Sequence, residues 1–466
     1  MPRFLNLATA EAVGQEVTIY GWVNTRRDMG KITFFDMRDR SGLLQVVLVP
    51  AELDDASRDL VTGIRPEYCL AVTGLVQARG AKQVNPNLPT GTVELLAKHV
   101  EILNPSKTPP FELEDTSGIN EELRMKYRYL DLRSARMQRN IRLRDKVISF
   151  MRDYLHGQDF VEVETPYITK GTPEGAREFL IPSRNQPGQF YALPQSPQQF
   201  KQLLMVGGME RYFQVARCFR DEDQRGDRQP EFTQLDLEMS FVDRENVLEL
   251  IEDMMIKMIR TVTPEKRIQQ IPFPRYSYQE VMDKYGSDKP DFREDKDDPN
   301  LLAFAWIIDF PFFEATEDGG WTFSHNPFSR PKPEHMQWLM EKSHIGEILT
   351  TQYDLVLNGY EAGGGSIRNH EPEALKKVFE IMGFDEEGIQ SQFGHMLESF
   401  TYGAPPHGGI APGVDRLVMI LANEPNIREV IAFPKTGDGR DLMMGAPSEV
   451  PQKSLDEVHI KISRGE

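Results

Sequence analysis

Two alternating segments joined by a charged loop constrain the fold of this chain most strongly. Between residues 212 and 220, and again between 234 and 239, side chains alternate as the two faces of a strand require. In the second segment the apolar face is Leu235, Leu237 and Met239, and the polar face is Gln234, Asp236 and Glu238. Because the connecting loop is too charged to be core, we predict an antiparallel hairpin. Its polar face suits an anionic ligand with a cationic end.

The composition is typical of a globular protein with several domains. The 466 residues can form two or three domains, each with its own core. No apolar run is long enough to span a bilayer, and the N-terminus lacks the apolar core of a signal peptide. Cys69 and Cys218 lie far apart in predicted strands, so we expect buried thiols and a cytoplasmic location. The formal net charge of −18 argues against binding nucleic acid through bulk charge, so such a partner requires local basic patches.

The N-terminal part has an all-β pattern. Five strand-like segments lie at about 17–23, 31–37, 43–49, 68–76 and 92–97, with a helix-compatible piece at 53–60 between the third and the fourth. This order fits an OB-fold barrel, which binds oligonucleotides on one face. The residues that suit stacking on and reading of single-stranded bases are Arg26, Arg27, Phe34, Arg38, Gln45 and Arg79. The alternative is a solvated charged rim with Phe34 in the core, and spacing alone does not separate the two.

The chain is expected to divide into three parts. Residues 1–104 form the OB-fold domain, residues 105–133 a proline-containing linker, and residues 134–466 a catalytic domain. The third part is α+β, an antiparallel sheet flanked by helices, with one helix predicted from about 134 to 157 and a strand from 160 that stops at Pro166. Residues 169–176 form a Gly/Pro loop that is typical of a mobile lid and carries Glu174. Neither a Walker loop nor a dinucleotide fingerprint occurs.

Four cations lie in or beside the predicted pocket elements: Lys201, Arg220, Arg368 and Arg416. A single arginine is usually a surface residue, but the residues flanking these favour a site for carboxylate or phosphate. Glycines precede Arg368 and permit close approach of a ligand, and Arg416 opens an apolar helix whose N-terminus attracts phosphate. Asp354 and Glu361 could hold Mg²⁺ through oxygen. Two acidic residues at a strand end are the alternative for that pair.

Three short segments carry a family resemblance. Residues 160–166, 219–222 and 413–416 resemble motifs 1, 2 and 3 of class II tRNA synthetases and occur in the same order. Residues 172–176, 195–201 and 363–368 are more specific, because they separate aspartate enzymes from their lysine and asparagine relatives. Over nearly its whole length the chain resembles aspartyl-tRNA synthetases of the bacterial type. The class II catalytic fold is therefore expected after the barrel.

The resemblance implies a reaction, its cofactors and its partners. L-aspartate would react with Mg²⁺-bound ATP to give aspartyl-adenylate, and the aspartyl group would pass to the 3′ end of tRNA-Asp, or in some members also of tRNA-Asn. Motif 1 implies a homodimer. The residues expected to be catalytic are Arg220, Arg416 and Lys201. The residues expected to bind ATP are Arg220, Glu222, Gln229, Glu361, Gly413, Val414, Asp415 and Arg416, with Asp354 and Glu361 holding Mg²⁺.

The resemblance also implies an amino-acid pocket. Lys201 and Arg368 would hold the aspartate side chain, and two cations there favour a carboxylate over an amide, because a desolvated unpaired charge is costly. The expected aspartate-binding residues are Glu174, Ser196, Gln198, Lys201, Arg220, Asp236, His325 and Arg368. His325 would add to the preference for aspartate when protonated, although on spacing alone it is a turn histidine.

On the barrel, the resemblance implies an anticodon site. Phe34 would stack on a base, and the residues expected to hydrogen-bond nearby are Arg27, Gln45, Arg79 and Glu94. Met29 lies in a loop thought to influence tRNA choice and favours charging of tRNA-Asp alone.

The chain departs from the family pattern in two places. Members of the bacterial type carry a large inserted domain where this chain has a short charged run at 288–300, so the tRNA contacts of that domain are in doubt. Asn326 also replaces a second histidine that many members have.

Three other functions are open to such a chain. A tRNA-independent paralogue that makes an adenylate would usually lack the barrel. An oligonucleotide-binding protein without enzymatic activity would not need an ATP site, and an asparaginyl enzyme would not need Lys201.

Overall fold

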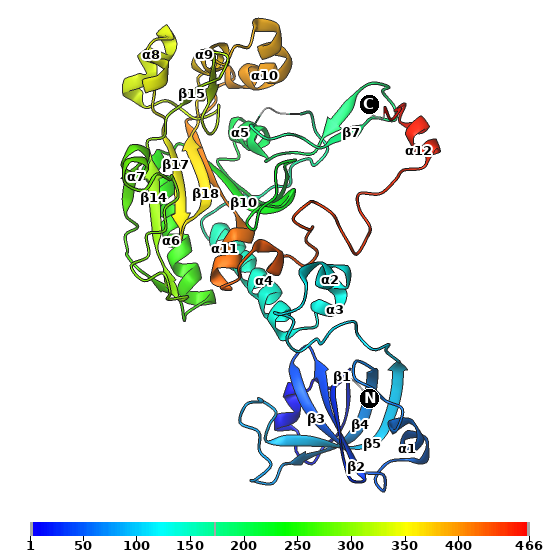
Figure 1. The fold of residues 1–466 in the computed structure, drawn as a ribbon. Helices are drawn as coiled ribbons and strands as arrows, with labels where there is room; N and C mark the ends of the chain where they lie inside the picture. Colours follow the sequence, from blue (N-terminus) through cyan, green and yellow to red (C-terminus); the bar gives the residue numbers. More distant parts are fainter. Residues whose placement is uncertain (1–2, 172–173, 464–466) are drawn as a thin grey trace. The chain divides into compact units, whose positions relative to one another are not determined.

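The structure is a computed structural model that describes residues 3–171 and 174–463. The chain divides between Thr116 and Ser117 into two units, Met1–Thr116 and Ser117–Glu466 (Figure 1). This boundary lies inside the predicted linker, 105–133. The later residues of that stretch form two short helices of the second unit, α2 (Glu121–Lys126) and α3 (Arg128–Asp131).

The first unit is a closed five-stranded barrel, as predicted. Its strands are β1 (Glu16–Met29), β2 (Ile32–Asp39), β3 (Gly42–Leu48), β4 (Cys69–Ala78) and β5 (Val93–Asn104), in the order β1-β2-β3-β5-β4. Helix α1 (Asp55–Val61) lies between β3 and β4 and is capped by the Asp54 side chain, which accepts a hydrogen bond from Ser57 N. The alternating residues of each strand fill one apolar core, and this order with one helix after the third strand is the OB-fold.

The second unit is built on an eight-stranded sheet with the order β12-β14-β17-β18-β19-β10-β9-β6. The strands in chain order are β6 (Val161–Glu162), β9 (Arg211–Phe219), β10 (Glu231–Ser240), β12 (Arg275–Ser277), β14 (Phe304–Ile308), β17 (Gln352–Leu357), β18 (Tyr360–Ile367) and β19 (His407–Pro412). All pairs are antiparallel except β6 with β9 and β12 with β14. Strand β6 is shorter than the predicted strand, and its pairing with β9 ends at Glu162, so Pro166 is not what stops it.

Helices cover one face of this sheet (Figure 1). They are α4 (Ala135–His156), α6 (Arg244–Val262) and α11 (Val414–Leu421). Their apolar side chains pack with the apolar faces of β10, β17 and β19 in one large core. Helix α4 begins after Ser134, whose hydroxyl accepts from Met137 N, and ends at Gly157, as predicted. The other face of the sheet is left to polar residues of the same strands.

The remaining elements surround that polar face and the sheet edges. The helices are α5 (Gln198–Val206), α7 (Tyr278–Tyr285), α8 (Met336–Glu341), α9 (Pro372–Ile381), α10 (Glu386–Phe400) and α12 (Gln452–Glu457). Short strands form three two-stranded pairs: β7 (Leu180–Pro182) with β8 (Phe190–Ala192), β11 (Arg267–Ile268) with β13 (Leu301–Leu302), and β15 (Phe313–Ala315) with β16 (Trp321–Phe323). The described residues also form 3-10 helices: η1 (Leu7–Glu11) in the first unit, and η2 (Pro333–His335), η3 (Ile345–Glu347) and η4 (Ile427–Glu429) in the second. Residues 286–300 connect α7 to β13 without a domain of their own.

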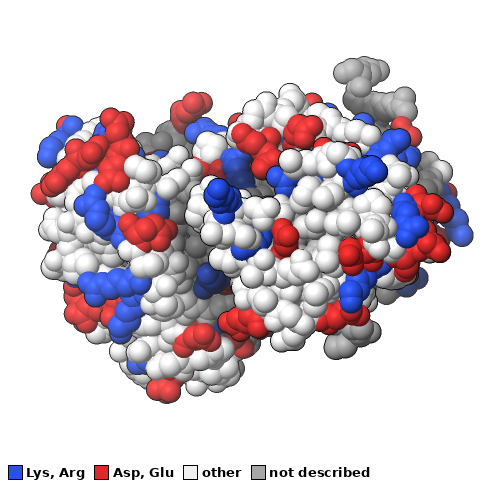
Figure 2. All heavy atoms as spheres, turned by 90° about the horizontal axis from the view of Figure 1, so that it is seen from below, with Lys and Arg blue, Asp and Glu red and all other residues white. Residues whose placement is uncertain are grey.

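The surface carries both signs of charge. On the face drawn in Figure 2, basic and acidic side chains are interspersed and neither forms one continuous area. Among the described residues, no helix has the length and apolar character needed to cross a membrane.

Candidate active site

The predicted hairpin forms the centre of the site. Strands β9 and β10 pair from Arg211 opposite Met239 to Phe219 opposite Glu231. Because side chains alternate along β10, Asp236 and Glu238 point away from the helices and into the polar face of the sheet, where both are fully buried. Arg220 follows the last residue of β9, and its backbone N–H donates to Pro230 O at 2.8 Å. The strand therefore ends just before the arginine that was predicted to lie on it.

Four buried charges form a chain beneath this face. The Lys201 ammonium on α5 lies 2.6 Å from Asp236 Oδ1 and 3.6 Å from Glu238 Oε2. The Arg368 guanidinium meets Glu238 with two hydrogen bonds, Nε to Oε1 at 2.8 Å and Nη2 to Oε2 at 3.0 Å. The two cations predicted to select a carboxylate are thus matched by two protein carboxylates. A substrate must therefore bring both a carboxylate for the cations and a cation for the carboxylates.

Burial and charge act in opposite directions on the two acids. Burial raises the pKa of Asp236, although Lys201 opposes this change. Burial would also raise the pKa of Glu238, but Arg368 and Lys201 hold it below its ordinary value. Glu238 is therefore a fixed anion, while Asp236 gains from a further cation. Its Oδ2 atom has no hydrogen-bond partner and lies beside the cavity.

Glycines of β18 and β19 make this arrangement possible. A Cβ on Gly409 of β19 would overlap with the Glu238 carboxylate and with Leu237 O. Glu238 and Ser366 both lie opposite Gly409 in register, one on each neighbouring strand. The Arg368 side chain, just beyond β18, can therefore cross β19 to reach Glu238, and its Nη2 also donates to Gly409 O at 3.3 Å.

A cavity of about 190 Å³ lies above these charges. Its walls include all eight predicted aspartate-binding residues: Glu174, Ser196, Gln198, Lys201, Arg220, Asp236, His325 and Arg368. Ser196 Oγ donates to Glu174 Oε2 at 2.6 Å, and the buried Gln198 Nε2 has no partner. Of the predicted lid segment 172–176, Thr172 and Pro173 lie outside the described residues. The unpaired polar atoms indicate a small polar ligand.

His325 differs from its predicted state. It lines the cavity and packs edge-on against Phe310, with ring centroids 4.6 Å apart. Burial lowers the pKa of His325, with Glu361 opposing the change. The ring is therefore neutral near neutral pH, and the predicted contribution of a protonated ring is not supported.

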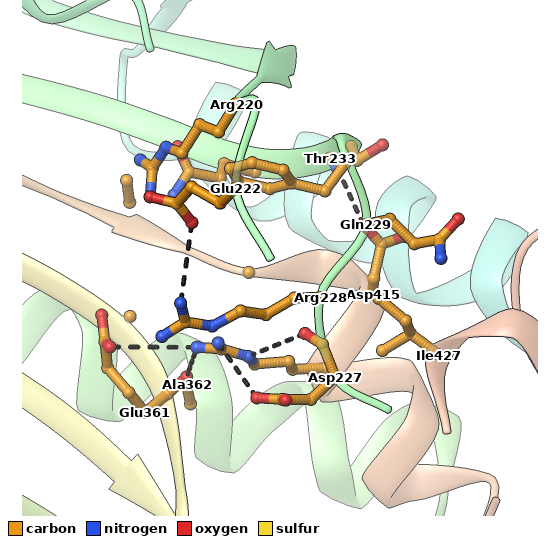
Figure 3. Close-up of a pocket in the computed structure, with 16 residues that line it drawn as sticks. Arg220, Glu222, Asp227, Arg228, Gln229, Thr233, Glu361, Ala362, Asp415 and Ile427 are labelled. Atoms are coloured by element: carbon orange, nitrogen blue, oxygen red, sulfur yellow. Dashed lines mark hydrogen bonds and ion pairs between the residues drawn. The ribbon is translucent and has the colours of Figure 1, made fainter. Parts of the chain in front are cut away.

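A second cavity, of about 170 Å³, adjoins the first (Figure 3). Arg416 on α11 enters it and pairs with Asp227, Nη2 to Oδ2 at 3.1 Å, while its Nη1 donates to Glu361 O at 2.9 Å. Across the loop that joins β9 to β10, Arg228 lies 3.6 Å from Glu222. Cationic side chains therefore surround a space whose apolar wall includes Phe232 and Ile427.

Arg220 lies where the two cavities meet, since it lines both. Its guanidinium stacks over the Phe232 ring at 5.0 Å from the centroid. Its Nε atom is buried and has no hydrogen-bond partner. This cation is preorganised for an anionic group at the junction of the cavities.

Asp354 and Glu361 converge over the glycines of β18. A Cβ on Gly364 would lie 2.9 Å from Asp354 Oδ1 and 3.4 Å from Glu361 Oε1. Burial raises the pKa of Asp354 well above its ordinary value, and the Glu361 charge adds to the rise. Within the described residues no three His, Cys, Asp or Glu side chains form a metal cluster. The pair therefore fits an ion that takes its other ligands from a substrate, as Mg²⁺ on a nucleotide does.

Three predicted ATP-binding residues make contacts with other parts of the chain. The Gln229 amide exchanges two hydrogen bonds with the Lys435 backbone, at 2.8 and 3.1 Å. The Asp415 carboxylate accepts from Thr233 N at 2.8 Å and pairs with Arg144. Val414 packs in the core instead of lining the cavity. Gly413 does line it, and its N–H donates to Ala362 O at 2.8 Å.

The barrel carries a separate polar network. Phe34 is half-buried while Phe35 is fully buried in the core, so Phe34 points outward and the core alternative for it is wrong. The network around it runs from Arg27 through Asp36 and Gln45 to Glu94 and Arg79, with Gln45 Nε2 donating to Glu94 Oε2 at 2.9 Å. All the predicted anticodon-binding residues thus share one outer face of the barrel.

Several residues of the site were not predicted. Glu238 was recognised only as a polar position on β10, and its pairing with Arg368 depends on strand order that the sequence does not reveal. Asp227, which holds Arg416, lies in a loop that has no periodic pattern. The alternation of β10 was the one available signal for Glu238.

Comparisons with known proteins agree with this geometry. The family described as tRNA synthetases class II (D, K and N) matches residues 120–437, and the OB-fold nucleic acid binding domain matches residues 17–103. A protein of Dehalococcoides mccartyi named aspartate--tRNA(Asp/Asn) ligase is 40% identical over 588 aligned positions, which cover 97% of this chain and 98% of the relative. One of Rubrobacter xylanophilus with the same name is 42% identical, with 97% and 95% covered.

One further relative and two solved structures extend the comparison. A protein of Geobacillus kaustophilus named aspartate--tRNA ligase is 39% identical, with 97% of each chain covered. Asparaginyl-tRNA synthetase from Pyrococcus horikoshii with asparaginyl-adenylate has a TM-score of 0.73 at 22% identity, covering 92% of this chain and 96% of that chain. A putative aspartyl-tRNA synthetase from Leishmania major has a TM-score of 0.73 at 21% identity, covering 93% and 94%. These structures are similar in fold. The 588-position alignment exceeds the 466 residues here, so the first relative has a long segment without a counterpart.

Proposed function

The chain belongs to the aspartyl-tRNA synthetase family of class II, and from this premise we propose that it activates L-aspartate with ATP and charges tRNA-Asp. In the first step an oxygen of the aspartate α-carboxylate attacks the α-phosphorus of ATP. Aspartyl-adenylate forms and pyrophosphate leaves. In the second step a ribose hydroxyl at the 3′ end of tRNA attacks the acyl carbon, the hydroxyl proton is lost, and AMP leaves.

The position of Arg220 is the observation that carries this proposal. Its guanidinium, whose buried Nε atom has no hydrogen-bond partner, lies between a cavity for a zwitterion and a cavity lined by Arg416 and Arg228. The two reacting groups, a carboxylate and a phosphate, are both anionic and would repel each other. A fixed cation between them lowers this repulsion and stabilises the charge that develops at phosphorus. Arg416 is placed to hold the outer phosphates.

Asp354 and Glu361 are the residues that would hold Mg²⁺. The raised pKa of Asp354 comes first from burial and then from the Glu361 charge, and a bound cation would relieve the repulsion between the two carboxylates. When bound, Mg²⁺ would neutralise phosphate charge of ATP. Gln352 Nε2 donates to Asp354 Oδ1 at 3.2 Å and so orients that carboxylate.

Selectivity for aspartate follows from the buried charges. The aspartate side-chain carboxylate would lie against Lys201 and Arg368, and its ammonium against Asp236 Oδ2 and Glu174. Asparagine would bring the same ammonium without the side-chain carboxylate, so one positive charge would stay unbalanced among buried charges that already pair with one another. We expect a discrimination on the order of a hundredfold or more from this difference.

The barrel would bind the anticodon. Phe34 offers an outward aromatic face beside the network from Arg27 to Arg79, which suits stacking and hydrogen bonding of unpaired bases. The chain is acidic overall, so recognition depends on such local features.

Two assays test this function. Aspartate should drive exchange of pyrophosphate into ATP, and the protein should charge a tRNA transcript with a GUC anticodon. Exchange without charging would indicate a tRNA-independent adenylate-forming paralogue. Absence of both activities would favour an oligonucleotide-binding protein and refute the proposal.

Charging of tRNA-Asn is a second candidate activity. The names of two relatives of 40% and 42% identity include both tRNA-Asp and tRNA-Asn, and the name of a third, of 39% identity, is aspartate--tRNA ligase. Met29, which favours strict charging, lies exposed at the end of β1. A transcript with a GUU anticodon separates the two: charging with aspartate would show relaxed choice, and its absence would support strict choice.

A homodimer through residues 160–166 also belongs to this proposal. Strand β6 lies at one end of the sheet order, and Val161 on it is exposed. An exposed apolar edge of this kind is suited to a second copy. Sedimentation of the wild type and of Val161→Asp checks the dimer, since the variant should be monomeric.

A further inference from the structure

The loop between β9 and β10 is attached to a supporting segment, residues 426–436. Ile427 N donates to Gly226 O at 3.0 Å, and the Gln229 amide exchanges two hydrogen bonds with the Lys435 backbone. Gln229 and Ile427 both line the cavity that Arg416 enters, together with Glu222 and Arg228 of the loop. The shape of this cavity therefore depends on where the supporting segment lies.

The supporting segment is in turn held by one arginine of α3. Arg128 donates to three backbone carbonyls: Nη2 to Arg428 O at 2.5 Å, Nη2 to Ile431 O at 2.8 Å and Nε to Ala432 O at 3.0 Å. Its remaining nitrogen, Nη1, donates to Asp131 Oδ2 at 2.5 Å. The side chain is 3% exposed, so water does not replace these bonds easily.

Arg124 on α2 reinforces the same contact. Its guanidinium meets the Glu429 carboxylate with two hydrogen bonds, of 2.6 and 3.0 Å, and Glu429 is buried. Asp131 also lies 3.3 Å from Arg124, which ties the two arginines together. Helices α2 and α3 are the first helices after the boundary at Thr116, yet their arginines bind a segment about 300 positions later.

We propose that Arg128 is a positioning residue for the ATP cavity. It fixes the backbone of 428–432, this backbone fixes Ile427 and Lys435, and these hold Gly226 and Gln229 of the loop that carries Glu222 and Arg228. Only the planar fork of arginine can reach three carbonyls at once, so lysine at this position keeps the charge and loses the geometry. The inference rests on the proposed use of the cavity that Arg416 enters for ATP.

The test compares Arg128→Lys with wild type in aspartate-dependent pyrophosphate exchange and in direct titration with ATP. We expect KM for ATP and the ATP dissociation constant to rise about tenfold, because a small misplacement of binding groups weakens the complex. KM for aspartate should change less than about twofold, because the charges around Lys201 and Arg368 are untouched.

Arg136→Lys is the matched control. Arg136 belongs to the same network, but its hydrogen bonds go to the Glu424 side chain, and its Nη2 atom lies 3.6 Å from Glu429 Oε2. The Arg136→Lys substitution should lower the thermal stability of the protein and leave KM for ATP unchanged. If both variants raise KM for ATP equally, or if Arg128→Lys raises neither constant, the positioning role is refuted.

A second variant protects the test against misfolding. Should Arg128→Lys fail to fold, Glu429→Gln weakens the same attachment through Arg124 and should raise the ATP dissociation constant with that for aspartate unchanged. An unchanged ATP constant there refutes the inference. A wild type that shows no aspartate-dependent exchange refutes the proposed function instead, so the two failures are distinct.

Discussion

Arg368 and Glu238 form a two-pronged ion pair beneath the cavity that holds the predicted aspartate-binding residues, although 130 positions separate them in the sequence. Their strands are not neighbours, because β19 lies between β18 and β10. The pair closes over Gly409, where any side chain would intrude. The guanidinium expected to recognise the substrate is therefore oriented by the protein before a ligand arrives.

Breaking that pair should cost stability. Glu238→Gln removes the charge that Arg368 meets in a fully buried setting, so we expect a loss of about 3–5 kcal/mol in the free energy of unfolding, measured by urea titration. Glu231→Gln on the same strand is the control, because Glu231 pairs with Arg217 and Lys435 at the partly exposed end of β10. The free energy of unfolding of Glu231→Gln should fall by less than about 1 kcal/mol. Equal losses would contradict the importance of the buried pair.

Filling the space above Gly409 should disturb the same pair. Gly409→Ala places a methyl group against Leu237 O and the Glu238 carboxylate, so we expect a loss of about 1–3 kcal/mol and a higher KM for aspartate. Gly118→Ala is the control, since no heavy atom lies within 4 Å of its added Cβ. A Gly409→Ala protein with wild-type stability and KM would show that the pair does not need this space.

Asp354 gives the protein a pH dependence with a defined sign. Its folded-state pKa lies well above the ordinary value, through burial first and Glu361 second. Such a carboxyl takes up a proton on folding, so the metal-free protein loses stability as pH rises from the unfolded pKa through the folded one.

Asp354→Asn should remove the loss of stability that the metal-free protein shows as pH rises. At about pH 7 in chelator the variant should be more stable than wild type, and it should lose Mg²⁺-dependent exchange. Thermal unfolding as a function of pH measures the effect, and adding Mg²⁺ should stabilise only the wild type. Parallel pH profiles of the two proteins would contradict the assignment of the metal site.

The barrel can be tested apart from the catalytic chemistry. Phe34→Ala should raise KM for a GUC-anticodon transcript by about ten- to a hundredfold, because one base loses its stacking partner. Pyrophosphate exchange should be unchanged, and so should charging of a minihelix that lacks the anticodon stem. An equal effect on the minihelix would show that Phe34 acts through folding.

Local sequence patterns predicted the helices and strands, but they did not predict contacts between residues that are far apart in the sequence. The alternation of 212–239 indicated the hairpin, and Ser134 with Gly157 marked the ends of α4, because strand faces and helix caps depend on adjacent residues. The Arg368–Glu238 pair depends on the order β18-β19-β10.

The same limit explains the ATP cavity. Its basic residues were predicted from their flanks, but the contacts of Gln229 and Asp415 were not, because each is held by a residue far away in the chain. No feature of the sequence links Lys435 to Gln229 or Arg144 to Asp415. The ion pairs of Lys201 with Asp236 and of Arg368 with Glu238 were also not predicted, so the two cations were not matched with these carboxylates.

The ratio of kcat/KM for aspartate to that for asparagine in pyrophosphate exchange tests the central claim most directly. Because Asp236 and Glu238 already balance the buried charges of Lys201 and Arg368, an ammonium that enters without a side-chain carboxylate leaves an unbalanced buried charge, so the ratio should be about a hundred or more. A ratio near one, or faster exchange with asparagine or lysine than with aspartate, would contradict the assignment of the cavity above Lys201 and Arg368 to aspartate.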